Sequence, residues 1–142
     1  MSAPAVHEPP PQPLTDPDSE GFWRATAEGR LAICRCDSCG TWMQPALERC
    51  RACGGKTAFA DVSGKGSLYS FIVVHQPAVP GFRDKVPYLL GLVELPEQVG
   101  LRLATRLVDV DASELADGFA LRVEIVDHPG GDYRIPVFRP DR

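Results

Sequence analysis

The sequence predicts a mainly β protein that consists of an N-terminal helix, a four-cysteine zinc ribbon with rubredoxin-like knuckles, and a five-stranded OB-fold barrel. The ribbon is predicted from two closely spaced Cys-x-x-Cys pairs, each followed by glycine. The barrel is predicted from three strands, one helical turn and two further strands, the element order of an OB-fold, which other small barrels share. We expect a disordered Pro-rich arm over residues 1–15, the helix over 16–30, the ribbon over 31–62 and the barrel over 63–142.

Length, charge and hydropathy limit the classes of function. The 142 residues, 44% of them hydrophobic, suffice for one ordinary domain or two very small ones. A net charge of −4 and a pI of about 5.3 argue against nucleic acid as a partner, because its binders cluster Lys and Arg. No run of about twenty apolar residues predicts a membrane span. The N-terminus lacks the basic and apolar regions of a signal peptide, so we expect a cytoplasmic protein.

The predicted helix follows the proline-rich arm. Asp16 is a good N-cap with Pro17 at the first helical position, and Gly29 is the expected stop. Phe22 and Trp23 lie on one side of it, and so short a helix is marginal alone. The two aromatic side chains must therefore be buried, either against the chain's own ribbon or against a partner, and they are our candidates for a partner interface.

The predicted metal ligands are the four cysteines of the two knuckles. A Cys-x-x-Cys turn aims two sulfurs at one point, and the following glycine permits the left-handed turn that the knuckle needs. Four thiolates form a closed tetrahedral site, which predicts one structural and non-catalytic Zn²⁺ per chain. The ligands are Cys36, Cys39, Cys50 and Cys53.

Other interpretations of the cysteines and their neighbours remain open. The four cysteines could form disulfides or a redox dithiol, but disulfides need an oxidising compartment. The fifth cysteine, Cys34, is expected to be a small buried residue, with exchange against Cys36 as a metal ligand as the alternative. Three arginines flank the ligands and would either offset the negative charge of the site or be ordinary surface residues: Arg35, Arg49 and Arg51.

The remaining strands are predicted from β-branched and aromatic residues between turn signals. Gly91 is expected to mark a bulge or a bend in the second barrel strand. The ribbon strands are expected over residues 31–34, 41–45 and 57–62. The barrel strands are expected over 67–75, 88–95, 101–108, 119–126 and 133–138, with the helical turn over 111–115.

Outside the cysteines, the sequence contains no motif of a nucleophile, a phosphate loop or a catalytic metal. The chain alone is therefore predicted not to be an enzyme. The loop over residues 77–87 joins the first two barrel strands, where OB-folds commonly bind ligands. Its tip carries Phe82, Arg83 and Lys85, which could contact a phosphate-bearing ligand such as coenzyme A or a partner protein, or could belong to an ordinary solvated loop.

The chain resembles the zinc-ribbon and OB-fold proteins known as domain of unknown function 35, from about Phe22 to Pro140. Each matching piece is short, and the ordered set is specific. In chain order the pieces are Phe22-Trp23, Gly29-Arg30-Leu31, Cys36-x-x-Cys39-Gly40, Cys50-x-x-Cys53-Gly54, Val62-Ser63-Gly64-x-Gly66, Val73-Val74-His75, Pro87-Tyr88, Val93-Glu94-Leu95, Arg106-Leu107-Val108 and Phe138-Arg139-Pro140. Cys34 and the proline-rich arm do not map onto the family pattern.

The resemblance implies a function that composition alone does not. Such proteins are similar in being small accessory subunits of thiolase-superfamily enzymes, including lipid-transfer-protein-like aldolases that act on acyl-CoA thioesters in lipid and steroid side-chain degradation. The partner carries the catalytic residues, and the small subunit stabilises it, completes a heterotetramer or helps to hold the acyl-CoA. Related proteins are fused to hydratase-type domains. A stand-alone acyl-CoA-binding protein is the alternative.

Overall fold

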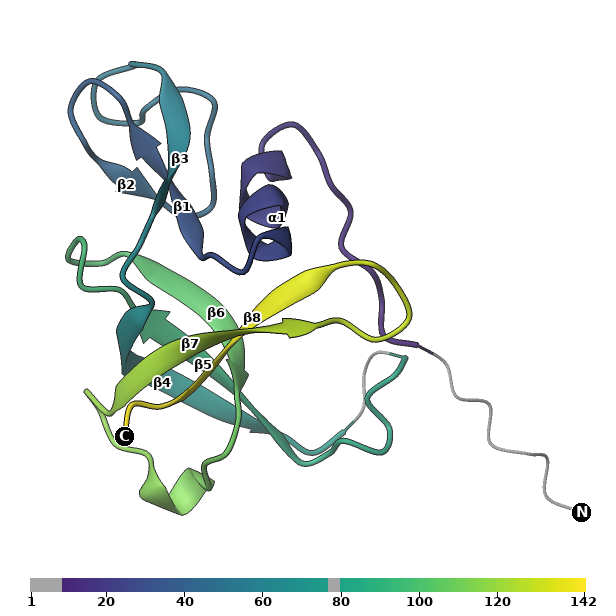
Figure 1. The fold of residues 1–142 in the computed structure, drawn as a ribbon. Coiled ribbons are helices and arrows are strands. Elements are labelled where there is room, and N and C mark those ends of the chain that lie inside the picture. The colour runs from purple at the N-terminus through teal and green to yellow at the C-terminus, as the bar shows by residue number, and fades with distance from the viewer. Residues whose placement is uncertain (1–8, 77–79) are drawn as a thin grey trace, which may run out of the picture.

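The computed structural model describes residues 9–76 and 80–142 and contains one helix, a small sheet and a closed barrel (Figure 1). The elements are α1 (Glu20–Ala27), β1 (Ala32–Cys36), β2 (Trp42–Met43), β3 (Thr57–Asp61), β4 (Lys65–Val74), β5 (Tyr88–Glu94), β6 (Arg102–Leu107), the 3₁₀ turn η1 (Ala112–Glu114), β7 (Ala120–Asp127) and β8 (Arg134–Pro140). The mainly β fold that the sequence predicts is thereby confirmed.

Helix α1 begins at Glu20, later than the sequence predicts. Asp16 and Ser19 bond reciprocally, since the Asp16 carboxylate accepts from the Ser19 N–H at 2.8 Å and the Ser19 hydroxyl accepts from the Asp16 N–H at 3.2 Å. These bonds close a separate turn before the helix. The end is as expected, because Gly29 has a φ of +80° and the Arg30 N–H bonds the Ala25 carbonyl, which is a Schellman closure.

The ribbon is a three-stranded antiparallel sheet in the order β2-β1-β3. Strand β1 pairs with β3 along its whole length, from Ala32 opposite Asp61 to Cys36 opposite Thr57. Strand β2 is only two residues long and pairs with β1 at Cys34 and Arg35. The pairing holds the two knuckles at the same end of the sheet, and α1 lies between this sheet and the β7–β8 hairpin (Figure 1).

The barrel closes in the order β4-β5-β6-β8-β7, which confirms the OB-fold. Of the two alternatives predicted for Gly91, the bulge is wrong, because Gly91 pairs with Phe71 in continuous register. The register between β4 and β5 shifts at Tyr69 instead, between Leu68 and Ser70. Gly91 has a different role, because a Cβ there would lie 2.8 Å from the side chain of Leu107. The glycine allows Leu107 to pack closely against β5.

The ribbon and the barrel share one hydrophobic core. Leu31, Ile33 and Trp42 of the ribbon belong to the same buried cluster as the barrel residues. The Gln98 side chain, from the turn between β5 and β6, accepts a hydrogen bond from the Trp42 N–H at 2.9 Å and donates one to the Trp42 carbonyl at 3.0 Å. This pair of bonds joins the edge of the ribbon to the barrel.

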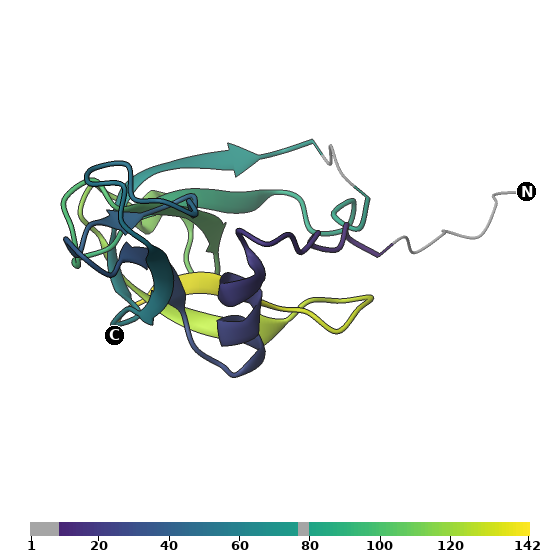
Figure 2. The same ribbon diagram turned by 90° about the horizontal axis from the view of Figure 1, so that it is seen from above.

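The described part of the proline-rich arm, residues 9–15, contacts the barrel. His128 Nε2 lies 2.8 Å from the Pro11 carbonyl, and the Gln12 amide donates to the Pro129 carbonyl at 2.9 Å. Figure 2 shows this segment passing between the β4–β5 loop and the β7–β8 hairpin. The sequence did not predict these contacts, because it indicated a disordered arm over residues 1–15. Residues 1–8 of that arm lie outside the described chain. Over the described ranges, no helix is long and apolar enough to cross a membrane.

Candidate metal centre

Two matching turns present the four predicted ligands. In the first knuckle the N–H groups of Ser38 and Cys39 point at the Cys36 sulfur, at 3.3 and 3.4 Å, and in the second the Ala52 N–H points at the Cys50 sulfur at 3.3 Å. Each turn is closed by the glycine after its second cysteine, with φ near +75° at Gly40 and Gly54. The backbone N–H groups would partly neutralise thiolates at these positions.

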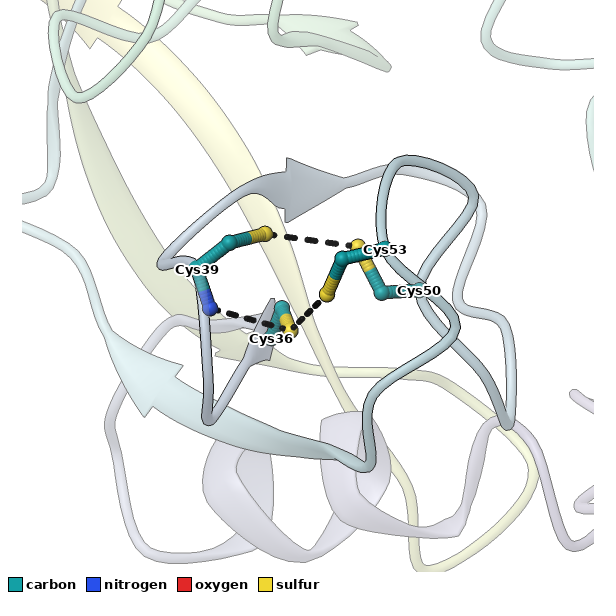
Figure 3. Close-up of side chains that lie close together, drawn as sticks. All are labelled: Cys36, Cys39, Cys50 and Cys53. Atoms are coloured by element: carbon teal, nitrogen blue, oxygen red, sulfur yellow. Dashed lines mark hydrogen bonds between the residues drawn. The ribbon is translucent and has the colours of Figure 1, made fainter.

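The four sulfurs converge on one point (Figure 3). All four lie within 4.8 Å of one another, with Cys36 3.5 Å from Cys53 and Cys39 3.6 Å from Cys50. A zinc ion with Zn–S bonds of about 2.3 Å in a tetrahedron would separate its sulfurs by about 3.8 Å. The cluster therefore fits a structural zinc site with four thiolates and no open coordination position.

The surroundings shift the pKa values of the thiols in opposite directions. The N–H groups of Cys39 and Ser38 lower the pKa of Cys36, and the Thr41 hydroxyl and N–H lower that of Cys39 to about 6. The Gly55 N–H lowers the pKa of Cys53, but the neighbouring thiols and burial outweigh it and raise that pKa to about 11. Four adjacent thiolates repel one another, so a cation is needed to hold all four ionised.

Of the residues around the four-sulfur cluster, Cys34 takes no part in the metal site and Arg35 contacts the first knuckle. Cys34 is 1% exposed and lies outside the four-sulfur cluster, with its thiol 3.5 Å from the Leu47 carbonyl, as expected for a buried apolar residue. Arg35 lies over the Trp42 ring, 4.7 Å from its centroid, and donates to the Gly40 carbonyl at 3.0 Å. Arg35 thus braces the first knuckle.

The loop residues Phe82 and Lys85 lie together, and a third residue joins them from a distant strand. Phe82 is 5.2 Å from the Tyr88 ring, and the Lys85 ammonium is 5.4 Å from Phe82. The Arg106 guanidinium from β6 lies 5.9 Å from Phe82 and 5.7 Å from Tyr88. Arg83 is exposed beside them. The sequence marks Arg106 only as part of the family resemblance and gives it no role, because its local signal is an outward position on a strand.

The candidate interface aromatics on α1 already contact their own chain. Phe22 packs against the shared core, and its ring lies edge-on to Trp23 at 4.8 Å. Trp23 also meets Tyr133 edge-on at 5.5 Å. Both are half-buried, so the chain covers part of each ring and leaves part available. Their assignment to a partner interface stays a prediction.

A four-cysteine ribbon joined to an OB-fold barrel defines the class of zinc-ribbon and OB-fold proteins. Two family models match this chain one after the other. The rubredoxin-like zinc ribbon domain of ChsH2 matches residues 23–59, and the C-terminal OB-fold domain of ChsH2 matches residues 60–126. A chain in the solved structure of the Ltp2-ChsH2(DUF35) aldolase is 32% identical with a TM-score of 0.82, and the match covers 92% of this chain and 100% of that one. The chain belongs to the DUF35/ChsH2 family.

Two curated relatives are longer proteins. The probable enoyl-CoA hydratase alpha subunit of Thermomonospora curvata is 34% identical over 131 residues, which is 92% of this chain and 40% of the relative. The 3-oxo-4,17-pregnadiene-20-carboxyl-CoA hydratase alpha subunit of Mycobacterium tuberculosis is 38% identical over 79 residues, 56% of this chain and 24% of the relative. This chain therefore spans less than half the length of either hydratase subunit.

Proposed function

We propose that this chain is a non-catalytic, zinc-containing accessory subunit of a thiolase-superfamily enzyme that acts on acyl-CoA, in retro-aldol cleavage of steroid or lipid side chains. The observation that carries the proposal is the match along nearly the whole chain to a chain of the Ltp2-ChsH2(DUF35) aldolase. The two hydratase relatives carry the matching region as a minor part of a longer protein. The end-to-end match therefore favours an aldolase partner over a hydratase.

The arrangement of side chains supports a non-catalytic role. Across residues 9–76 and 80–142, the four cysteines are the one group of three or more His, Cys, Asp or Glu side chains that could hold a metal ion. A closed four-cysteine site leaves no position for water or substrate, so we assign the zinc a structural role, with one ion per chain. Catalytic groups would then belong to the partner, and this chain would stabilise the complex as part of a heterotetramer.

Co-purification tests the proposal. The tagged chain is recovered from its native lysate at moderate salt, and the captured proteins are identified and quantified by mass spectrometry. We expect a thiolase-like protein in nearly equal amount and one zinc per chain by elemental analysis. A well-behaved monomer that ignores a co-encoded thiolase-like protein would overturn the assignment as an accessory subunit.

A stand-alone acyl-CoA-binding protein is the second candidate. The observation in its favour is that Lys85 and Arg106 both lie against the Phe82 ring, which groups two cations beside an aromatic surface. Arg83 would add a third cation at the loop tip. Calorimetry of acyl-CoA with the purified chain separates the two functions. Binding without a partner would favour the carrier, and no heat of binding would disfavour it.

A further inference from the structure

The outer face of β4, β5 and β6 carries several apolar side chains and an arginine. Residues directly opposite one another on antiparallel strands share a face, and Ile72, Leu90 and Arg106 form such a row across the three strands. The next rows place Leu92 and Tyr88 on the same side. The opposite side of these strands faces the barrel core, so this face is the one left open.

Ile72 is unusually exposed for its position. Its side chain is 60% exposed, and among the described residues it is the one exposed large aliphatic residue that lies within a strand. Leu90 and Leu92 beside it are half-buried. From Ser70 onward β4 pairs only with β5 in the part of the chain that the structure describes, and Figure 2 shows β4 as the outermost strand on its side of the molecule. Ile72 therefore lies on an open, apolar strand surface.

Arg106 gives this face an unsatisfied cation. Within the described ranges, its Nε atom is buried without a hydrogen-bond partner and its guanidinium joins no ion pair. The Phe82 and Tyr88 rings hold the guanidinium in place but accept no hydrogen bond from its N–H groups. The chain's own atoms cover Nε, so an acceptor from another molecule would bind the guanidinium through its Nη atoms, which make no ion pair with any described residue.

A second copy of the chain would not supply that acceptor. In a two-fold symmetric contact this face would meet itself and bring two Arg106 side chains into the interface. The one carboxylate on the face is Glu94, which already accepts hydrogen bonds from Arg102 and the Gly100 N–H at 3.2 Å each. The contact would bury two unpaired cations, which is strongly unfavourable.

A small ligand fits this face less well than a protein does. Ligand sites are concave, and three cavities in the described part of the chain, of about 380, 490 and 210 Å³, are not lined by Ile72 or Arg106. An exposed apolar strand surface edged by an arginine is typical of protein interfaces, where arginine and aromatic residues are enriched. The missing acceptor is therefore best supplied by a carboxylate of a different protein.

We propose that the outer face of β4–β5–β6 is the docking surface for a different protein, whose apolar side chains cover Ile72 and whose carboxylate binds Arg106. This inference rests on the proposed function, since it names the surface that the partner enzyme covers. It moves the interface away from Phe22 and Trp23 on α1, which partly bury each other and lie on another side of the barrel (Figure 1).

Two surface substitutions and two matched controls test the docking surface on the purified complex with the co-purified thiolase-like enzyme. Ile72→Lys adds a cation beside Arg106 on the face, and Arg106→Gln removes the unpaired charge while keeping most of the stem. Val99→Lys changes a residue that is 95% exposed in the β5–β6 turn, and Arg122→Gln changes an exposed arginine on β7. We expect Ile72→Lys and Arg106→Gln each to raise the Kd of the complex about tenfold or more, and the two control variants to leave the Kd unchanged.

Hydrogen exchange of the free chain and the complex gives an independent readout. We expect slower exchange in the complex over residues 69–74 and 88–92. If the complex forms with unchanged affinity for both face variants and protection falls on α1, the docking surface is wrong while the proposed function stands. If no thiolase-like enzyme binds, the proposed function fails and the docking surface fails with it.

Two further outcomes would assign the face to another occupant and overturn the proposal. The first is a free chain that sediments as a dimer and becomes a monomer with Ile72→Lys, which would make a second copy the occupant. The second is calorimetric binding of coenzyme A to the free chain that Arg106→Gln abolishes, which would make a phosphate the acceptor for Arg106.

Discussion

Replacing Gln98 by alanine should loosen the junction between the ribbon and the barrel. The Gln98 amide makes two hydrogen bonds to the main chain of Trp42, at 2.9 and 3.0 Å, and Trp42 is 5% exposed. Alanine removes both bonds and leaves a buried N–H and a buried carbonyl without their protein partner. The half-buried position of Gln98 lets water reach these groups after the substitution.

The size of the effect follows from the two bonds. Each contributes about 1 kcal/mol net, so the free energy of unfolding should fall by about 2 kcal/mol. For a chain of this length that corresponds to a decrease in Tm of about 4–8 °C. The loss should be local as well as global, because the Trp42 amide is held in place by the Gln98 oxygen.

Calorimetry on the zinc-loaded protein measures the Tm, and hydrogen exchange follows the Trp42 amide directly. Val99→Ala, at the neighbouring and almost fully exposed position, is the matched control and should leave both unchanged. If Gln98→Ala has the same Tm as the control and its Trp42 amide exchanges no faster, then the Gln98 hydrogen bonds do not stabilise the junction. The shared hydrophobic core alone would then hold the ribbon against the barrel.

Three further predictions concern the metal site and the barrel. Cys36→Ser should abolish zinc binding, as measured by elemental analysis, and unfold the ribbon. The reason is that a structural zinc contributes about 10–16 kcal/mol, which is comparable to a domain's whole stability. A zinc-free variant that melts like the wild type would contradict this. Gly91→Ala should lower the denaturant midpoint by the equivalent of about 1–3 kcal/mol, because its Cβ would lie 2.8 Å from Leu107, and an unchanged midpoint would contradict that close packing. Zinc binding to the reduced apoprotein at pH 7 should release protons, because Cys53, with a pKa raised to about 11, is protonated at that pH and must ionise to bind the metal, whereas Cys39, with a pKa lowered to about 6, is already mostly ionised. A calorimetric enthalpy that does not vary with the buffer's ionisation enthalpy would contradict it.

The parts of the fold that depend on local chemistry could be predicted from the sequence. The Cys-x-x-Cys-Gly pattern predicts the knuckles because a glycine with positive φ must close each turn, and Gly40 and Gly54 do so. The order of strands around the helical turn predicts the barrel. Gly29 ends α1 because a left-handed residue closes the last turn of a helix.

The parts that depend on contacts between distant residues could not be predicted. The Gln98–Trp42 bonds join positions 56 residues apart, and no local pattern marks either residue as a partner. Gly91 lies in a strand as a bulge residue would, but the reason for a glycine at this position is the Leu107 side chain from β6, which leaves no room for a Cβ. Arg106 looks like any outward arginine until the fold brings Phe82 and Tyr88 beside it.

The most direct test of the central claim is an activity measurement on the separated and recombined proteins. Cleavage of an acyl-CoA bearing a β-hydroxy side chain is followed with this chain alone, with the thiolase-like enzyme alone and with both at equal concentration. The account predicts no turnover by this chain alone and full activity only when both proteins are present. Turnover by this chain alone, or an enzyme equally active without it, would contradict a non-catalytic accessory role.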